Sequence, residues 1–173
     1  MKCELPTLHG ERVVLRPLAA DDAEPLADML MTPEVSRWWG PHDREHHRAG
    51  FVEDAARNDA FAIEVDGALA GWLGVYEEVE PDYRHGGLDI FLAPAAQGAG
   101  HGPRALRLAA RWLVDERGHH RLIIDPAAAN ERAIGAYAAI GFRPVGVMRA
   151  YERGADGEWH DGLLMDMLAE ELR

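Results

Sequence analysis

Asp89 and three nearby glycines carry the clearest chemical signal in this sequence, and all of them lie within residues 87–104. Asp89 interrupts the apolar run Leu88–Ala93, where a carboxylate is costly to bury unless it faces a cleft or finds a partner. Pro94 ends the run, and glycines then stand at alternate positions, at Gly98, Gly100 and Gly102. A glycine-rich turn between a strand and a helix directs free backbone N–H groups and the positive end of the helix dipole at one point. The stretch therefore predicts an anion site, most often one for phosphate.

The spacing of these glycines excludes two common phosphate-binding motifs. The turn lacks the G-x-x-x-x-G-K-[ST] pattern of the P-loop. Its glycines run G-x-G-x-G and are followed by Pro103, so the dinucleotide fingerprint G-x-G-x-x-G fails as well. Another kind of phosphate ligand is therefore expected.

Hydrophobic periodicity predicts the elements that position this turn. Apolar runs and alternation predict strands over residues 11–18, 60–65, 69–76, 88–93, 121–125, 142–149 and 159–168. Helical spacing and capping residues predict helices over residues 20–31, 41–57, 104–117 and 131–140. The pair Asp66-Gly67 is a strong signal for a hairpin turn. The order β-α-α-β-β-β-α-β-α-β-β predicts an α/β fold, a mixed sheet with helices on both faces, in a single domain over residues 1–173.

Composition narrows the possible partners. The formal net charge is −12, with 30 acidic residues against 18 basic ones, which argues against a nucleic-acid partner. This charge permits a cationic substrate without demanding one, because an acidic surface can also serve only to keep a protein in solution. No apolar run is long enough to span a membrane, and the first residues lack the layout of a signal peptide. The lone Cys3 can form no internal disulfide. A cytoplasmic protein with neither a membrane nor a nucleic-acid partner is expected.

Two motifs resemble those of the GNAT N-acetyltransferases. The sequence from Gln97 to Gly102, QGAGHG, resembles their acyl-CoA motif Q/R-x-x-G-x-G/A. The sequence from Asn130 to Phe142 resembles their helix pattern N-x-x-A-I-x-x-Y-x-x-x-G-F. The two motifs stand in the family's order, and the resemblance covers nearly the whole chain. It implies the GNAT fold, with its central twisted mixed sheet, and acetyl-CoA as cofactor.

The resemblance also implies which residues bind acetyl-CoA. They are Leu92, Gln97, Gly98, Ala99, Gly100, His101, Gly102, Asn130 and Tyr137. The backbone N–H of Leu92 would polarise the thioester carbonyl, and Tyr137 would protonate the leaving thiolate. A tyrosine packed in the core is the alternative for Tyr137. Pro103 has no backbone N–H and so removes one possible donor from this turn, although proline is tolerated in the first turn of a helix.

The acceptor side resembles one subfamily, the aminoglycoside 6′-N-acetyltransferases. Their corresponding strand resembles the sequence GLDIFL around Asp89, where an aspartate binds or deprotonates the attacked amine. Asp125 with Pro126, and the pair Trp38-Trp39 before Gly40, resemble their D-P and W-W-G segments. We expect Trp39, Tyr76, Asp89 and Asp125 to bind the substrate. The alternative for Asp89 is a strand residue that points to solvent.

The resemblance implies acetyl transfer from acetyl-CoA to a primary amine, foremost an aminoglycoside 6′-amine, by direct attack in a ternary complex. A protein N-terminus, a polyamine or a siderophore amine is an alternative acceptor, and a non-catalytic acyl-CoA sensor is an alternative function. The histidines at positions 42, 46 and 47 lack an acidic or cysteine partner, so no metal site is expected. The chain is expected to be a monomer or a homodimer. Trp38, His160 and Asp161 remain without an assigned role.

Overall fold

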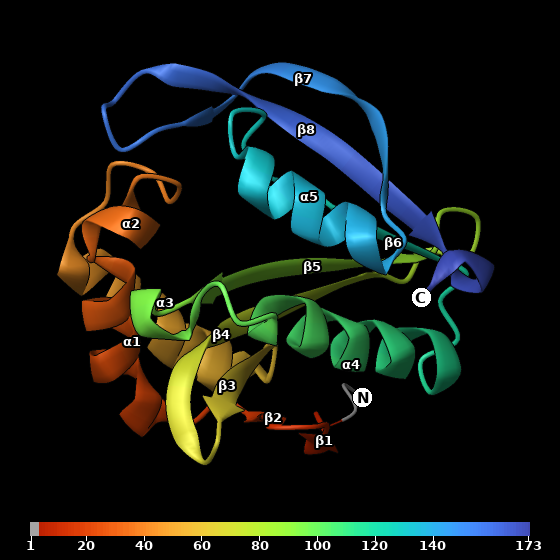
Figure 1. Cartoon of the computed structure of the whole chain (residues 1–173), viewed down its shortest axis with the longest axis horizontal. Coiled ribbons are helices and arrows are strands. Elements are labelled where there is room, and N and C mark those ends of the chain that lie inside the picture. Colours follow the sequence, from red (N-terminus) through yellow and green to blue (C-terminus); the bar gives the residue numbers. More distant parts are fainter. Residues whose placement is uncertain (1–3) are drawn as a thin grey trace.

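The computed structural model describes residues 4–173, which fold around an eight-stranded sheet in the order β1-β2-β3-β4-β5-β6-β8-β7 (Figure 1). Every neighbouring pair is antiparallel except β5 and β6, which are parallel, so the expected mixed sheet is confirmed. Cys3 lies outside the described residues. The strands are β1 (Leu8–His9), β2 (Val13–Pro17), β3 (Ala60–Val65), β4 (Ala68–Glu78), β5 (His85–Leu92), β6 (Arg121–Ile124), β7 (Arg143–Arg153) and β8 (Trp159–Leu168).

Helices cover both faces of this sheet. They are α1 (Ala23–Leu30), α2 (Pro33–Ser36), α3 (Arg44–Arg57), α4 (His101–Asp115) and α5 (Glu131–Ile140), with short 3-10 turns η1 (Ala20–Asp22), η2 (Pro94–Ala96) and η3 (Ala169–Glu171). Side chains along β3 point alternately to the two faces of the sheet, so the core has two parts. Phe61 and Ile63 pack toward α4 and α5, whereas Ala60 and Ala62 pack toward α1–α3. No helix among the described residues is both apolar and long enough to cross a membrane.

Local sequence signals explain several element boundaries. Asp43 caps α3 by accepting a hydrogen bond from the His46 N–H at 2.8 Å, and Asn130 caps α5 by accepting one from the Ala133 N–H at 3.2 Å. At the end of α5, Gly141 has a φ of 127°, which a residue with a side chain rarely adopts. The hairpin between β3 and β4 turns at Asp66-Gly67, as predicted.

The parallel contact between β5 and β6 is short, and this creates the gap around which the candidate site is built. Gly86 pairs with Leu122 and Gly87 pairs with Ile123, but the pairing ends there. On its other edge, β5 stays paired with β4 as far as Leu92. The two parallel strands therefore diverge beyond Gly87.

The structure also corrects the expected boundaries of several elements. Strand β7 extends to Arg153 rather than ending at residue 149, and β4 and β5 reach further into the acidic connection than predicted. The short strand β1 and the short helix α2 were not predicted. Figure 1 shows the β7–β8 hairpin crossing over α5, with its tip on the side of α2.

Candidate active site

Two carboxylates face each other across the gap between β5 and β6. Asp89 and Asp125 each follow the last pair of the parallel register, Gly87 with Ile123, by two residues. Register thus places them at equal heights on the two diverging strands, and Asp125 is close enough to raise the pKa of Asp89. Both line one cavity of about 640 Å³, called here the carboxylate cavity.

Asp89 is in an unfavourable environment for a charged carboxylate. Its side chain is exposed toward the cavity, yet the protein atoms around it remove part of the water that would otherwise solvate the carboxylate. This desolvation, with the nearby charges of Asp125 and Glu152, raises the pKa of Asp89 to about 7. One hydrogen bond opposes the shift, because Oδ1 accepts from the Ile90 N–H at 2.9 Å. Asp89 can therefore change its protonation state near neutral pH.

A second cavity, of about 560 Å³, adjoins the first and is called here the glycine-turn cavity. Five residues line both cavities: Trp38, Trp39, Ile90, Asn130 and Tyr137. Tyr137 is only 8% exposed, and burial, followed by the charges of Asp89 and Asp125, raises its pKa further above the ordinary range of a phenol. Its hydroxyl thus stays protonated at neutral pH, at the junction of the two cavities.

The glycine turn offers free backbone donors at the start of α4. The N–H groups of Gly98, Ala99 and Gly100 bond to no residue between positions 4 and 173. Gly98 has a φ of 82° and Gly100 a φ of 78°, values that strain a residue with a side chain. Together with the dipole of the 15-residue helix α4, the turn forms an anion cradle.

Gln97 stabilises this turn through two side-chain hydrogen bonds. Its Nε2 donates to the Leu92 carbonyl at 2.8 Å, and its Oε1 accepts from Arg132 Nη1 at 3.1 Å. The Ala93 N–H donates to the Ala70 carbonyl on β4, so strand alternation directs the Leu92 N–H away from β4 and into the gap. The end of β5 therefore presents a free backbone donor at a residue that lines the glycine-turn cavity.

Strand β7 brings two further side chains to the carboxylate cavity. The Tyr151 hydroxyl donates to Asp125 Oδ2, and this bond raises the pKa of Tyr151 to about 12. Burial and the charge of Asp125 raise the pKa of Glu152. Neither residue was predicted for the site, because β7 was expected to end at residue 149. Arg132, which bonds to Gln97, was missed for want of any sequence signal.

The remaining predicted residues occupy varied positions. Trp39 packs edge-on against Trp72 and Phe91, with ring centroids 5.7 Å and 5.5 Å away, and also lines both cavities. Tyr76 is 54% exposed, bonds to Glu78, and lies outside the lining of either cavity. His101 and Gly102 line the glycine-turn cavity.

Histidines 42, 46 and 47 contact one another through their rings. Between residues 4 and 173, no group of three or more His, Cys, Asp or Glu side chains is arranged to hold a metal ion.

Comparisons with known proteins agree with this geometry. The chain is 26% identical over 170 residues to spermidine N(1)-acetyltransferase of Escherichia coli K12, covering 93% of this chain and 87% of the relative. It is 25% identical over 167 residues to aminoglycoside N(6′)-acetyltransferase type 1 of Klebsiella pneumoniae, covering 85% and 82%. The structure of Mycobacterium smegmatis RimJ in complex with CoA-disulfide superposes with a TM-score of 0.80 at 23% identity, covering 96% of this chain and 88% of that one.

A family model described as an acetyltransferase (GNAT) domain matches residues 12–143, well over half of the sequence. The eight-stranded mixed sheet, the diverging parallel strands and the glycine turn before α4 are the structural counterpart of that match. The chain therefore belongs to the GNAT family of acetyltransferases, enzymes that use acetyl-CoA to acetylate an amine.

Proposed function

We propose that this protein acetylates a primary amine of a small polycationic acceptor, foremost the 6′-amine of an aminoglycoside. The observation that carries the proposal is a set of three carboxylates, Asp89, Asp125 and Glu152, that line one cavity beside the glycine turn. Burial and mutual repulsion raise the pKa values of Asp89 and Glu152. Because a ligand with several ammonium groups would relieve this repulsion, it is the chemical match for the cavity.

The residues of the glycine-turn cavity fit acetyl-CoA, which supplies the activated acetyl group when it is bound. Free N–H groups at Gly98, Ala99 and Gly100, followed by the first turn of α4, suit the pyrophosphate. Gln97 would hold the turn in place through its two hydrogen bonds. His101, Gly102 and Asn130 would contribute cavity walls, with Asn130 fixed by its capping bond.

Asp89 is proposed to bind the ammonium group and then accept its proton, since only the free amine has a lone pair for attack. A pKa of about 7 suits this task, because a general base works best when its pKa lies near the working pH. Asp125, oriented by Tyr151, would bind a second ammonium group. Trp39 would form an aromatic wall against the acceptor, whereas the position of Tyr76 outside the cavity linings gives it little support.

The Leu92 N–H and Tyr137 are proposed to act on the other side of the reaction. The Leu92 N–H would stabilise negative charge on the carbonyl oxygen as the amine attacks. Tyr137, which stays protonated, would donate its proton to the departing sulfur, and the second proton that the nitrogen loses as the amide forms would restore the phenol. Direct attack is favoured because the two cavities share Tyr137, and because the chain's one cysteine is Cys3, remote in sequence from these motifs.

A polyamine is the second candidate acceptor, because the 26% identical relative is a spermidine acetyltransferase. A linear polyamine carries several ammonium groups and would satisfy the same carboxylates. A cavity of about 640 Å³ with walls at Trp39 and Trp159 suits the rings of an aminoglycoside better than a narrow aliphatic chain. We therefore place an aminoglycoside before a polyamine as the acceptor.

The test is coenzyme A release, measured by thiol detection, with kanamycin, tobramycin, spermidine, an alanine-initiated peptide and butylamine as acceptors. We expect turnover with the polycations and a far higher KM for butylamine, with kanamycin and tobramycin giving the highest kcat/KM. Mass spectrometry and NMR of the product would locate the acetyl group. Preference for spermidine would replace the first candidate with the second. Binding of acetyl-CoA without turnover of any amine would refute the enzymatic proposal and favour an acyl-CoA sensor.

A further inference from the structure

Strand β7 contains an irregularity where it faces Asp161 of β8. Met148 pairs with Gly162 and Glu152 pairs with His160, so three residues of β7 stand between pairs where β8 has only Asp161. At the centre of this bulge, Ala150 has a φ of 49°, a left-handed conformation that is strained for alanine. The Asp161 carboxylate faces that residue, and its Oδ1 accepts from the Ala150 N–H at 2.8 Å.

The bulge changes which β7 side chains reach the carboxylate cavity. Neighbouring residues of a regular strand point to opposite faces, but Tyr151 and Glu152 both line the carboxylate cavity, and Tyr151 bonds to Asp125 there. A bulge redirects side chains in this way. Gly162 leaves the necessary room, because a Cβ at that position would stand 2.7 Å from Tyr151 Cδ1.

Asp161 also connects to the segment that carries Asp125. Its backbone carbonyl accepts from the Ala128 N–H at 2.8 Å, and the Leu163 N–H donates to the Pro126 carbonyl at 2.8 Å. The side chain of Asp161 thus fixes the bulge of β7, while its backbone fixes the loop after β6. Asp161 therefore bonds both to the strand that carries Tyr151 and to the loop that follows Asp125.

We propose that Asp161 is a positioning residue of the acceptor site: its carboxylate fixes the β7 bulge, so that Tyr151 orients Asp125 and Glu152 enters the carboxylate cavity. The proposal rests on the proposed function for the meaning of that cavity, but its geometric part is independent of it. Asp161 contacts neither reacting group and acts through Tyr151 and Glu152.

The experiment compares Asp161→Ala, Asp161→Asn and the double variant Asp161→Ala/Ala150→Gly. An asparagine Oδ1 still accepts from the Ala150 N–H, so Asp161→Asn should resemble the natural protein. Glycine adopts the left-handed conformation freely, so Ala150→Gly should restore part of what Asp161→Ala loses. The matched control is Asp156→Ala, which removes another exposed carboxylate of the same hairpin and breaks its pair with His160.

The first readout does not depend on activity. The chain has four tyrosines, so NMR of tyrosine labelled with ¹³C at Cζ gives few signals, and Tyr151→Phe identifies the relevant one. In Asp161→Ala the Tyr151 hydroxyl should lose its bond to Asp125 and titrate at lower pH, toward the ordinary pKa of about 10. In Asp161→Asn and Asp156→Ala it should titrate as in the natural protein. An unchanged Tyr151 titration in folded Asp161→Ala would overturn the proposed role in fixing the bulge.

The second readout is kinetic, with the acceptor found in the amine panel. Asp161→Ala should raise the acceptor KM roughly three- to tenfold, the effect of one lost hydrogen bond, and leave the KM for acetyl-CoA unchanged. A shifted Tyr151 signal with an unchanged acceptor KM would overturn the functional half of the proposal. If no amine is turned over, the proposed function fails while the NMR result still decides whether Asp161 fixes the bulge. Circular dichroism and thermal melting verify that each variant folds.

Discussion

Asp89 combines a proposed catalytic role with a pKa raised to about 7. If it is the base, kcat/KM for the acceptor should rise with pH through about 7 as Asp89 loses its proton. Asp89→Asn should lower kcat by about 10²- to 10⁴-fold and remove this ionisation from the profile. Steady-state kinetics from pH 5.5 to 9 would check both. A turnover equal to that of the natural enzyme would exclude Asp89 as the base.

The same substitution should stabilise the fold at alkaline pH. The pKa of Asp89 is higher in the folded state than in the unfolded chain, so the folded protein binds this proton more tightly. The free energy of unfolding therefore falls as pH rises from about 4, where the carboxyl ionises in the unfolded chain, to about 7, where it ionises in the folded protein. Asp89→Asn should therefore raise the melting temperature at pH 8, with a gain that shrinks toward pH 4. Asp21→Asn, at an exposed carboxylate of η1 outside both cavities, is the matched control for the loss of one carboxylate.

The turn before α4 depends on backbone conformation, which separates its effect from that of the carboxylate cavity. Gly100→Ala places a side chain on a residue with a φ of 78°, so the turn should relax and its N–H groups should lose their alignment. We expect the KM for acetyl-CoA to rise about tenfold, with a much smaller change in the acceptor KM. Gly135→Ala in α5 is the matched control, because a Cβ there meets nothing within 4 Å. An unchanged KM for acetyl-CoA in Gly100→Ala would contradict the cradle.

The sequence predicted those features of the fold that depend on local signals. The hairpin at Asp66-Gly67, the cap of α5 and the glycine turn all follow from short-range chemistry, and all appear in the structure. The meeting of Asp89 with Asp125 depends on the parallel register of β5 and β6, which only the resemblance to relatives suggested. The contribution of β7 could not be predicted, because the bulge depends on a long-range bond between Ala150 and Asp161.

The molecule as a whole is acidic, and three of its 30 acidic residues, Asp89, Asp125 and Glu152, line the carboxylate cavity. With a formal net charge of −12, the surface should attract a polycation, and salt should screen this attraction. For an acceptor with three or more ammonium groups, kcat/KM should fall severalfold between 50 mM and 500 mM salt. Butylamine, with a single charge, should respond far less, and kcat at saturation should change little.

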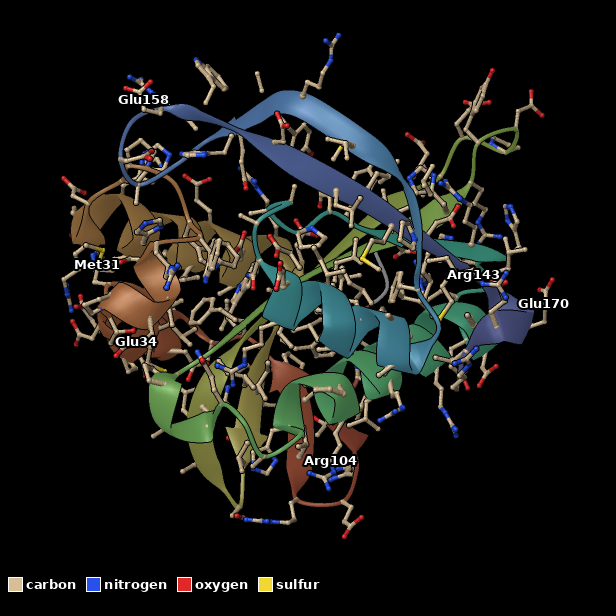
Figure 2. The ribbon with its side chains drawn as sticks, turned by 45° about the horizontal axis from the view of Figure 1, so that its top comes forward. Met31, Glu34, Arg104, Arg143, Glu158 and Glu170 are labelled. Carbon is tan, nitrogen blue, oxygen red and sulfur yellow. The ribbon has the colours of Figure 1, made fainter. Side chains whose placement is uncertain are left out.

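Two variants separate the contribution of the carboxylate cavity to this salt dependence from that of the rest of the acidic surface. Glu152→Gln removes a carboxylate that lines the cavity, whereas Glu170→Gln removes an exposed one in η3, far from the hairpin tip that carries Glu158 (Figure 2). If the cavity dominates, Glu152→Gln should raise the KM for the polycation and flatten its salt dependence, and Glu170→Gln should leave both nearly unchanged. Equal effects of the two variants would mean that general attraction by the acidic surface, rather than a built cation site, brings the acceptor to Asp89. Because the two substitutions remove the same formal charge, stopped-flow or steady-state kinetics on matched salt series can tell these cases apart.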